Sequence, residues 1–280
     1  MKIKAYGKVN IALDILGKKE DGYHILKMIM QTVNIYDELT FTKGKEGIHI
    51  TSNKDFVPTD NRNLVYKAID LFCTTYGIKR EVDVHIEKNI PVEAGMAGGS
   101  TDAAAALKAM RDLYRPDVSN EELRELGVKL GADVPYCIEG GTALCEGIGE
   151  IITPLKSFKD KLMVVVKPEF GVSTVETYKG FKLDEVKKHP MVDNIIEAME
   201  NDDVEYVAKN MMNLLELVTI KKHKEIQDIK EFMCKEGALG AMMSGSGPTV
   251  FSFFNDINKA NQCADKLKSR YKEVFVTKTV

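Results

Sequence analysis

The chain has 280 residues, of which 44% are hydrophobic and 29% are charged, as is ordinary for a globular protein of one large domain or two smaller ones. Its 39 basic and 42 acidic residues give a net charge of -3, so no positive excess indicates nucleic acid or an anionic membrane as a partner. An anionic ligand must therefore be held by a local site.

Cysteine usage and the N-terminus indicate a cytoplasmic protein. The five cysteines are scattered without CxxC spacing, and the five histidines show no metal-site spacing, so we expect free thiols in a reducing compartment. Lys8, Asn10 and Asp14 interrupt the apolar residues at the start, which argues against a signal peptide. No apolar run approaches the roughly 20 residues that cross a bilayer.

The first forty residues alternate in polarity or carry β-branched side chains, which predicts strands. We expect breaks at Gly7 and in the turn-rich segment 17–23. A polar hairpin is predicted over residues 39–51. The alternating pattern of residues 81–88 predicts a half-buried strand that leads into a glycine-rich segment.

Helical spacing and turn signals account for the rest of this half. The predicted elements are a helix over 63–76 stopped by Gly77, a helix over 101–114, a helix from the Ser119–Glu122 capping box to Leu130, and a hairpin around 147–149.

The composition becomes polar around residues 154–160, which predicts a boundary between two domains, 1–157 and 158–280. The second half reads as a strand, several helices, two strands, a helix and a last strand, which is the split βαβ order of ferredoxin-like domains. These predicted elements cover 161–167, the stretch between 173 and 236, 237–243, 248–254, 256–270 and 273–280. The sequence thus predicts a two-domain α+β protein.

The segment PVEAGMAGGST (residues 91–101, the first glycine segment) joins a predicted strand to a predicted helix. Small residues let several backbone N–H groups face one anion, and the helix start adds its unpaired N–H groups and positive dipole end. Neither the Walker A pattern nor GxGxxG is present. The residues alone leave two interpretations open, a phosphate-binding loop and a closely packed strand-to-helix turn.

Five segments together resemble the GHMP kinases (galactokinase, homoserine kinase, mevalonate kinase and relatives), and the resemblance spans nearly the whole chain. The segments are AYGKVNIALDILGKKEDGYH (5–24), PVEAGMAGGSTDAAAAL (91–107), GADVPYC (131–137), FGVSTVETY (170–178) and MSGSGPTVF (243–251). The resemblance implies the α+β GHMP kinase fold, with an N-terminal ATP-binding domain like domain 2 of ribosomal protein S5 and a C-terminal ferredoxin-like domain on the substrate side.

The resemblance also implies an ATP-dependent kinase whose alcohol substrate carries a cytidine diphosphate group. Glu93 stands where small residues are usual, and Ala97 replaces a glycine, which predicts a negative φ at that position. The residues implied to bind ATP are Pro91, Val92, Glu93, Ala94, Gly95, Met96, Ala97, Gly98, Gly99, Ser100 and Thr101. Mg²⁺ is expected with ATP, its ligands are not identifiable, and Ser100 is a candidate neighbour of the ion.

Lys8 and Asp133 match the family's catalytic lysine and aspartate. On their own, a strand-edge lysine and a turn-capping aspartate are common structural features. The resemblance implies that Asp133 accepts the proton of the alcohol, while Lys8 keeps Asp133 ionised and orients the hydroxyl. Pro135 predicts an extended Val134 beside Asp133.

Substrate-binding residues are implied in three places. Asn10 lies two residues after Lys8 on the same strand face. Tyr23, His24 and Tyr178 match positions that bind cytosine, with the two tyrosines on opposite faces of the base. Ser244, Gly245, Ser246 and Gly247 form a second glycine-rich turn, which is either a plain hairpin loop or a set of N–H donors for the substrate's diphosphate.

Two rival functions remain. One is a GHMP kinase for homoserine or mevalonate, which would have no use for a cytosine site. The other is a nucleotide-binding sensor or an S5-like RNA-binding module, against which the acidic net charge and the Lys8 and Asp133 matches argue. We therefore expect a small-molecule substrate, no nucleic acid, no membrane, and a monomer or homodimer.

Overall fold

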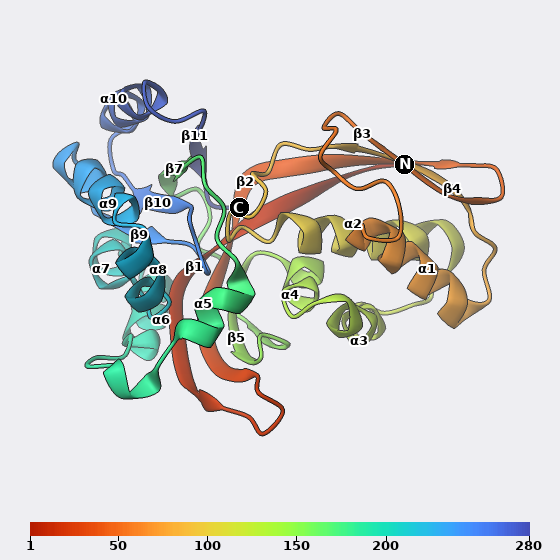
Figure 1. Ribbon diagram of the computed structural model, residues 1–280, viewed down its shortest axis with the longest axis horizontal. Coiled ribbons are helices and arrows are strands. Elements are labelled where there is room, and N and C mark those ends of the chain that lie inside the picture. Colours follow the sequence, from red (N-terminus) through yellow and green to blue (C-terminus); the bar gives the residue numbers. More distant parts are fainter. The chain divides into compact units, whose positions relative to one another are not determined.

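The computed structural model describes all 280 residues, and the chain divides into two compact units (Figure 1). The long strands β1 (Lys2–Lys18) and β2 (His24–Lys43) pass through both units. The first unit comprises Met1–Gly7, Ile35–Ile90 and Ala97–Gly140, and the second comprises Lys8–Asn34, Pro91–Met96 and Gly141–Val280. The proposed domain boundary at 157/158 stays a prediction.

In the first unit, β4 (Glu81–Glu87) lies between β2 and β3 (Gly47–Ser52). β4 pairs antiparallel with β2 and parallel with β3. The hairpin predicted over 39–51 is therefore wrong, because β3 does not pair with β2. Every second side chain of β4 is an apolar, buried residue, which suits a central strand, and β3 takes the edge. Gly7 does not interrupt β1 either, since an extended glycine fits a continuous strand.

Helices α1 (Leu64–Tyr76), α2 (Gly98–Tyr114), α3 (Asn120–Leu130) and α4 (Val134–Glu139) gather beside these strands (Figure 1). Asn63 caps the start of α1, and Gly77 ends it with φ of 65°. The capping box of Ser119 and Glu122 opens α3 as predicted. One apolar core joins the four helices to β2, β3 and β4. The alanines of α2 let that helix approach its neighbours closely.

The second unit holds the other half of the long strands. β5 (Thr142–Gly147) pairs with the first part of β2 and forms the predicted hairpin with β6 (Ile151–Pro154). The short strand β8 (Met212–Asn213) pairs with β1 through Ala12 and Leu13. The sequence pattern did not predict β8, because two residues are too few for a periodic signal.

The same unit contains a fully antiparallel sheet in the order β11-β7-β10-β9, which confirms the ferredoxin-like arrangement. Its strands and helix follow the predicted order: β7 (Leu162–Lys167), β9 (Gly240–Met243), β10 (Val250–Phe253), α10 (Ile257–Lys268) and β11 (Glu273–Lys278). Between β7 and β9 the chain forms α5 (Thr174–Gly180), a 3-10 turn (Leu183–Glu185), α6 (Val192–Glu200), α7 (Val204–Asn210), α8 (Glu216–Lys222) and α9 (Glu225–Lys235).

No disulfide forms among the five cysteines. None of the helices combines the length and the apolar character that crossing a lipid bilayer would need.

Candidate active site

The first glycine segment contains the start of α2. The helix begins at Gly98, three residues earlier than predicted, so Gly98, Gly99 and Ser100 form its first turn. No side chain caps this end, and the first N–H that bonds back along the helix is that of Thr101, which donates to the Ala97 carbonyl at 2.9 Å. The three N–H groups before it lack intrahelical acceptors, as at any helix start, and suit an anion.

Three residues before the helix have positive φ: Glu93 (51°), Gly95 (69°) and Ala97 (58°). The negative φ predicted for Ala97 is wrong, because Ala97 is the left-handed residue from which the chain enters α2. A non-glycine residue adopts this conformation at a cost of roughly 1–2 kcal/mol. The carboxylate of Glu93 lies against the backbone of Gly171, so it is directed to the segment before α5 within the second unit.

The turn at residues 244–247, the second glycine segment, packs directly on the first within the second unit. The Ser244 hydroxyl donates to the Gly95 carbonyl at 2.9 Å. A Cβ on Gly95 would overlap the Ser244 carbonyl oxygen, and one on Gly245 would lie 3.1 Å from the Gly95 oxygen. Only glycine allows the two backbones to approach this closely. The turn therefore forms one wall of the loop rather than a free hairpin end.

Side chains that the sequence analysis did not single out hold the second glycine segment in place. The Asn213 amide donates to the carbonyls of Met243 and Gly245, both at 2.8 Å. The Thr219 hydroxyl donates to the Ser246 carbonyl at 3.1 Å. The hydroxyls of Ser246 and Thr174 lie 2.8 Å apart. No sequence pattern marks these residues, because each is used through a contact with a distant part of the chain.

Lys8 and Asn10 lie beside both glycine segments. The Lys8 ammonium donates to the Asn10 side-chain oxygen at 2.7 Å, and the Lys8 N–H donates to the Met96 carbonyl at 3.1 Å. The same Asn10 oxygen lies 3.6 Å from a Cβ position on Gly245. Lys8 is only 4% exposed. The second unit thus brings a buried positive charge to the place where the two glycine segments meet.

Asp133 belongs to the first unit, where it is the N-cap of α4 and is half-buried. Val134 is the first residue of that helix, so the prediction that it is extended is wrong. Pro135 occupies the second helical position, where the missing N–H costs nothing because no carbonyl within the helix would accept it. The steric preference before proline is outweighed by the helix that follows.

His24 and Tyr178 come together, with ring centroids 5.2 Å apart and planes tilted by 33°. Phe181, which was not predicted from the sequence, forms a T-shaped pair with His24, with ring centroids 6.0 Å apart. Tyr23, which precedes His24 in the sequence, is 58% exposed. Burial, with a smaller contribution from Lys18, lowers the pKa of His24, so its ring is neutral at pH 7 and can both donate and accept a hydrogen bond.

No group of three histidine, cysteine, aspartate or glutamate side chains has the arrangement of a metal site. A Mg²⁺ ion that enters with ATP takes most of its ligands from phosphate and water, so the absence of a dedicated cage does not conflict with that role. Among the expected residues, the hydroxyl of Ser100 stands in the first turn of α2.

Comparison with known families matches residues 63–141 to the GHMP kinases N terminal domain and residues 187–273 to the GHMP kinases C terminal domain. A curated 4-diphosphocytidyl-2-C-methyl-D-erythritol kinase of Clostridium beijerinckii is 60% identical over 280 residues, which is the full length of both chains. This chain belongs to the GHMP kinase family.

Solved structures show the same relationship for this GHMP kinase. A crystal structure of 4-(cytidine 5'-diphospho)-2C-methyl-D-erythritol kinase has a TM-score of 0.86 and 29% identity, with 100% of this chain and 99% of that chain covered. Homoserine kinase from Cytophaga hutchinsonii has a TM-score of 0.78 at 19% identity, covering 99% of this chain and 94% of that one. The second likeness concerns the fold alone.

Proposed function

We propose that this GHMP kinase transfers the γ-phosphoryl group of ATP to the 2-hydroxyl of 4-diphosphocytidyl-2-C-methyl-D-erythritol, in the non-mevalonate route to isoprenoid precursors. The full-length relative at 60% identity supports this substrate. The observation that carries the chemistry is the meeting of the two glycine segments beside Lys8 and Asn10. A buried cation next to closely packed backbone amides is a site for a phosphorylated ligand.

ATP binds through the first glycine segment, residues 91–101. The free N–H groups at the start of α2 and its positive dipole end face the phosphates, and the small side chains leave room for them. Mg²⁺ bound with ATP neutralises charge on the phosphates. The carboxylate of Glu93 lies against Gly171.

Phosphoryl transfer needs an aligned hydroxyl and a proton acceptor. Asp133 takes the proton of the substrate's 2-hydroxyl, the oxygen attacks the γ-phosphorus, and the bond to the β-phosphate oxygen breaks to release ADP. Lys8 offsets the charge that develops on the transferred group. Asn10 accepts a hydrogen bond from Lys8 and so fixes the direction of the ammonium.

The cytidine end of the substrate is held by aromatic residues of the second unit. Tyr23 and Tyr178 stack on the cytosine ring, and the neutral His24 bonds its polar edge. Stacking of this kind contributes about 1–3 kcal/mol per base. The backbone of Ser244, Gly245, Ser246 and Gly247 binds the diphosphate.

A coupled assay of ADP release with the cytidylated alcohol, homoserine and mevalonate, each tested alone with Mg·ATP, checks the proposal. We expect turnover with the cytidylated alcohol only. Turnover with homoserine or mevalonate instead would identify a different member of the family. RNA binding at physiological salt without any turnover would contradict a kinase function.

The aromatic site has its own test. Tyr23→Ala removes one stacking face, so KM for the cytidylated alcohol rises about 10-fold while KM for ATP is unchanged. Tyr23→Phe keeps the ring and is the matched control, with both constants unchanged. Equal losses for both substrates in Tyr23→Ala would contradict the role of Tyr23 in binding cytosine.

A further inference from the structure

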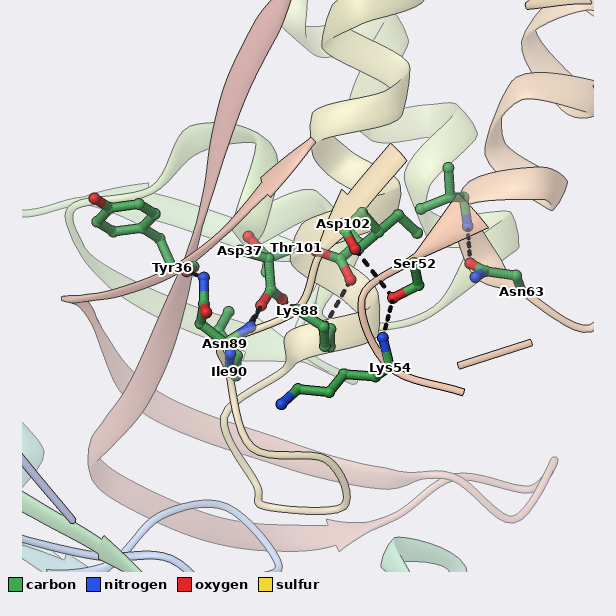
Figure 2. A network of polar contacts seen from close by, with 12 residues as sticks. Tyr36, Asp37, Ser52, Lys54, Asn63, Lys88, Asn89, Ile90, Thr101 and Asp102 are labelled. Atoms are coloured by element: carbon green, nitrogen blue, oxygen red, sulfur yellow. Dashed lines mark hydrogen bonds and ion pairs between the residues drawn. The ribbon is translucent and has the colours of Figure 1, made fainter. Parts of the chain in front are cut away.

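A buried ionic network lies at the base of the first glycine segment, within the first unit (Figure 2). The ammonium of Lys88 donates to Asp37 at 2.5 Å and to Asp102 at 2.7 Å. The side chains are 7%, 0% and 6% exposed, respectively. Removing a lysine and two carboxyl groups from water this completely costs free energy, and an apolar core would avoid that cost.

Each carboxylate fixes a different end of the loop. Asp37, on β2, also accepts the N–H groups of Asn89 and Ile90, at 2.6 and 2.8 Å, where the chain leaves β4 and enters the loop. Asp102 belongs to α2, where the chain leaves the loop. Lys88 therefore joins the entry and the exit of residues 91–97 through one ammonium group.

The same ammonium supports the first turn of α2 from below. A Cβ on Gly98 would lie 3.0 Å from the Lys88 nitrogen and 3.2 Å from Ile90, so the first helical residue rests on the network. A second anchor is the Thr101 hydroxyl, which donates to the Tyr6 carbonyl at 2.8 Å. These contacts fix the position and direction of the first turn of α2, whose N–H groups lack intrahelical acceptors.

The arrangement is unfavourable in one respect, which indicates that its benefit lies in geometry. One oxygen of Asp102 is buried without a hydrogen-bond donor. A network built only for stability would avoid leaving this oxygen without a donor.

We propose that Lys88 is a positioning residue for ATP, an inference that rests on the ATP site proposed above. By bridging Asp37 and Asp102 it holds the two ends of residues 91–97 and the first turn of α2 at the separation that the phosphates require. Lys88 does not touch the reacting atoms. A displacement of about 1 Å in such a site is enough to cost about 100-fold in rate.

The test measures binding without turnover. Calorimetry with Mg²⁺ and a non-hydrolysable ATP analogue gives Kd for the wild type, Lys88→Met and the control Lys108→Met. Lys108 lies on α2, ten residues beyond Gly98, and its ammonium donates to the Cys137 carbonyl. We expect Kd to rise about 10-fold or more for Lys88→Met and to stay unchanged for Lys108→Met.

Kinetics then separate positioning from general loosening. In Lys88→Met, KM for ATP rises and KM for the alcohol substrate does not, whereas a merely structural defect would raise both. Should Lys88→Met not fold, the double variant Lys88→Met/Asp102→Asn removes the bridge while Asp37 keeps its two backbone donors, and the same result is expected. Unchanged affinity in a folded variant overturns the inference. Failure of the wild type to bind the analogue refutes the ATP site itself.

Discussion

Lys8 shows how a single residue acquires a chemical role from its neighbours. It lies in the buried part of β1, where an ammonium group is stable only with polar partners. Asn10 supplies one such partner, and the Met96 carbonyl fixes the backbone of Lys8 against the first glycine segment. The charge is thus held in one direction before any ligand binds, which is the condition for electrostatic catalysis.

We expect Lys8→Ala and Asp133→Asn each to lower kcat by about 100-fold or more, because positioning and general-base losses have that size. The measurement is steady-state turnover of the cytidylated alcohol at saturating ATP. Circular dichroism establishes that each variant is folded. Turnover near the wild-type rate in either folded variant would show that the residue concerned has another role.

Asp102 is the residue whose charge state responds to pH. Burial, with a further contribution from Asp37, raises its pKa to about 8, although Lys88 acts in the opposite direction. A carboxyl with a folded pKa above its unfolded value binds its proton more tightly in the native state. Its contribution to stability is complete below the unfolded pKa and is lost as the pH rises to about 8.

The difference in the free energy of unfolding between the wild type and Asp102→Asn should therefore decrease from about pH 5 to about pH 8 and then level off. Urea unfolding of both proteins across that range measures it. Asparagine has nearly the same shape as aspartate but does not titrate. The contributions of all other titrating groups therefore cancel in the difference between the two proteins. A difference that stays constant or increases with pH would contradict the raised pKa.

At the scale of elements, the decisive feature is the contact between two turns that are about 150 residues apart in the sequence. The sequence alone shows that each turn is rich in glycine and predicts a helix at α2. It does not predict the contact between the turns, because that contact depends on β8 and α8, through Asn213 and Thr219. Long-range packing of this kind leaves no periodic pattern in the chain.

Gly95→Ala should destabilise the protein and raise KM for ATP, because the added Cβ would overlap the Ser244 carbonyl and φ is positive. Strain of this kind costs about 1–3 kcal/mol. Thermal unfolding gives the loss of stability. Gly17→Ala is the control, since its Cβ would meet only Ile25 at 3.8 Å. If both variants melt at the wild-type temperature, the two turns do not require glycine for their contact.

At the scale of the whole molecule, the order of elements was predictable and part of the pairing was not. The split βαβ order predicted the sheet β11-β7-β10-β9, because that motif has a characteristic strand order. The hairpin predicted over 39–51 failed, since a polar stretch after a strand does not reveal that β4 takes the central place. The pairs that define the candidate site were assigned by resemblance to a family rather than by periodicity.

The last residues of the chain connect the two sheets of the second unit. Thr279 forms hydrogen bonds with the backbone of Asp160 and Lys161, just before β7. It also forms an antiparallel β-bridge with Val33 of β2. Val280 donates to the Thr32 carbonyl at 3.0 Å and accepts from the Gln31 amide at 3.0 Å. Two residues thus tie together strands from the beginning and the middle of the chain.

Removal of Thr279 and Val280 should lower Tm by about 5 °C or more, because each lost hydrogen bond is worth about 1 kcal/mol and leaves buried backbone groups unsatisfied. Differential scanning calorimetry measures the shift. Lys278→Ala is the matched control: that side chain is exposed at the end of β11, and its loss should leave Tm unchanged. If the shortened chain melts with the wild type, the two sheets are held by their apolar faces alone, and the terminal hydrogen bonds contribute nothing measurable.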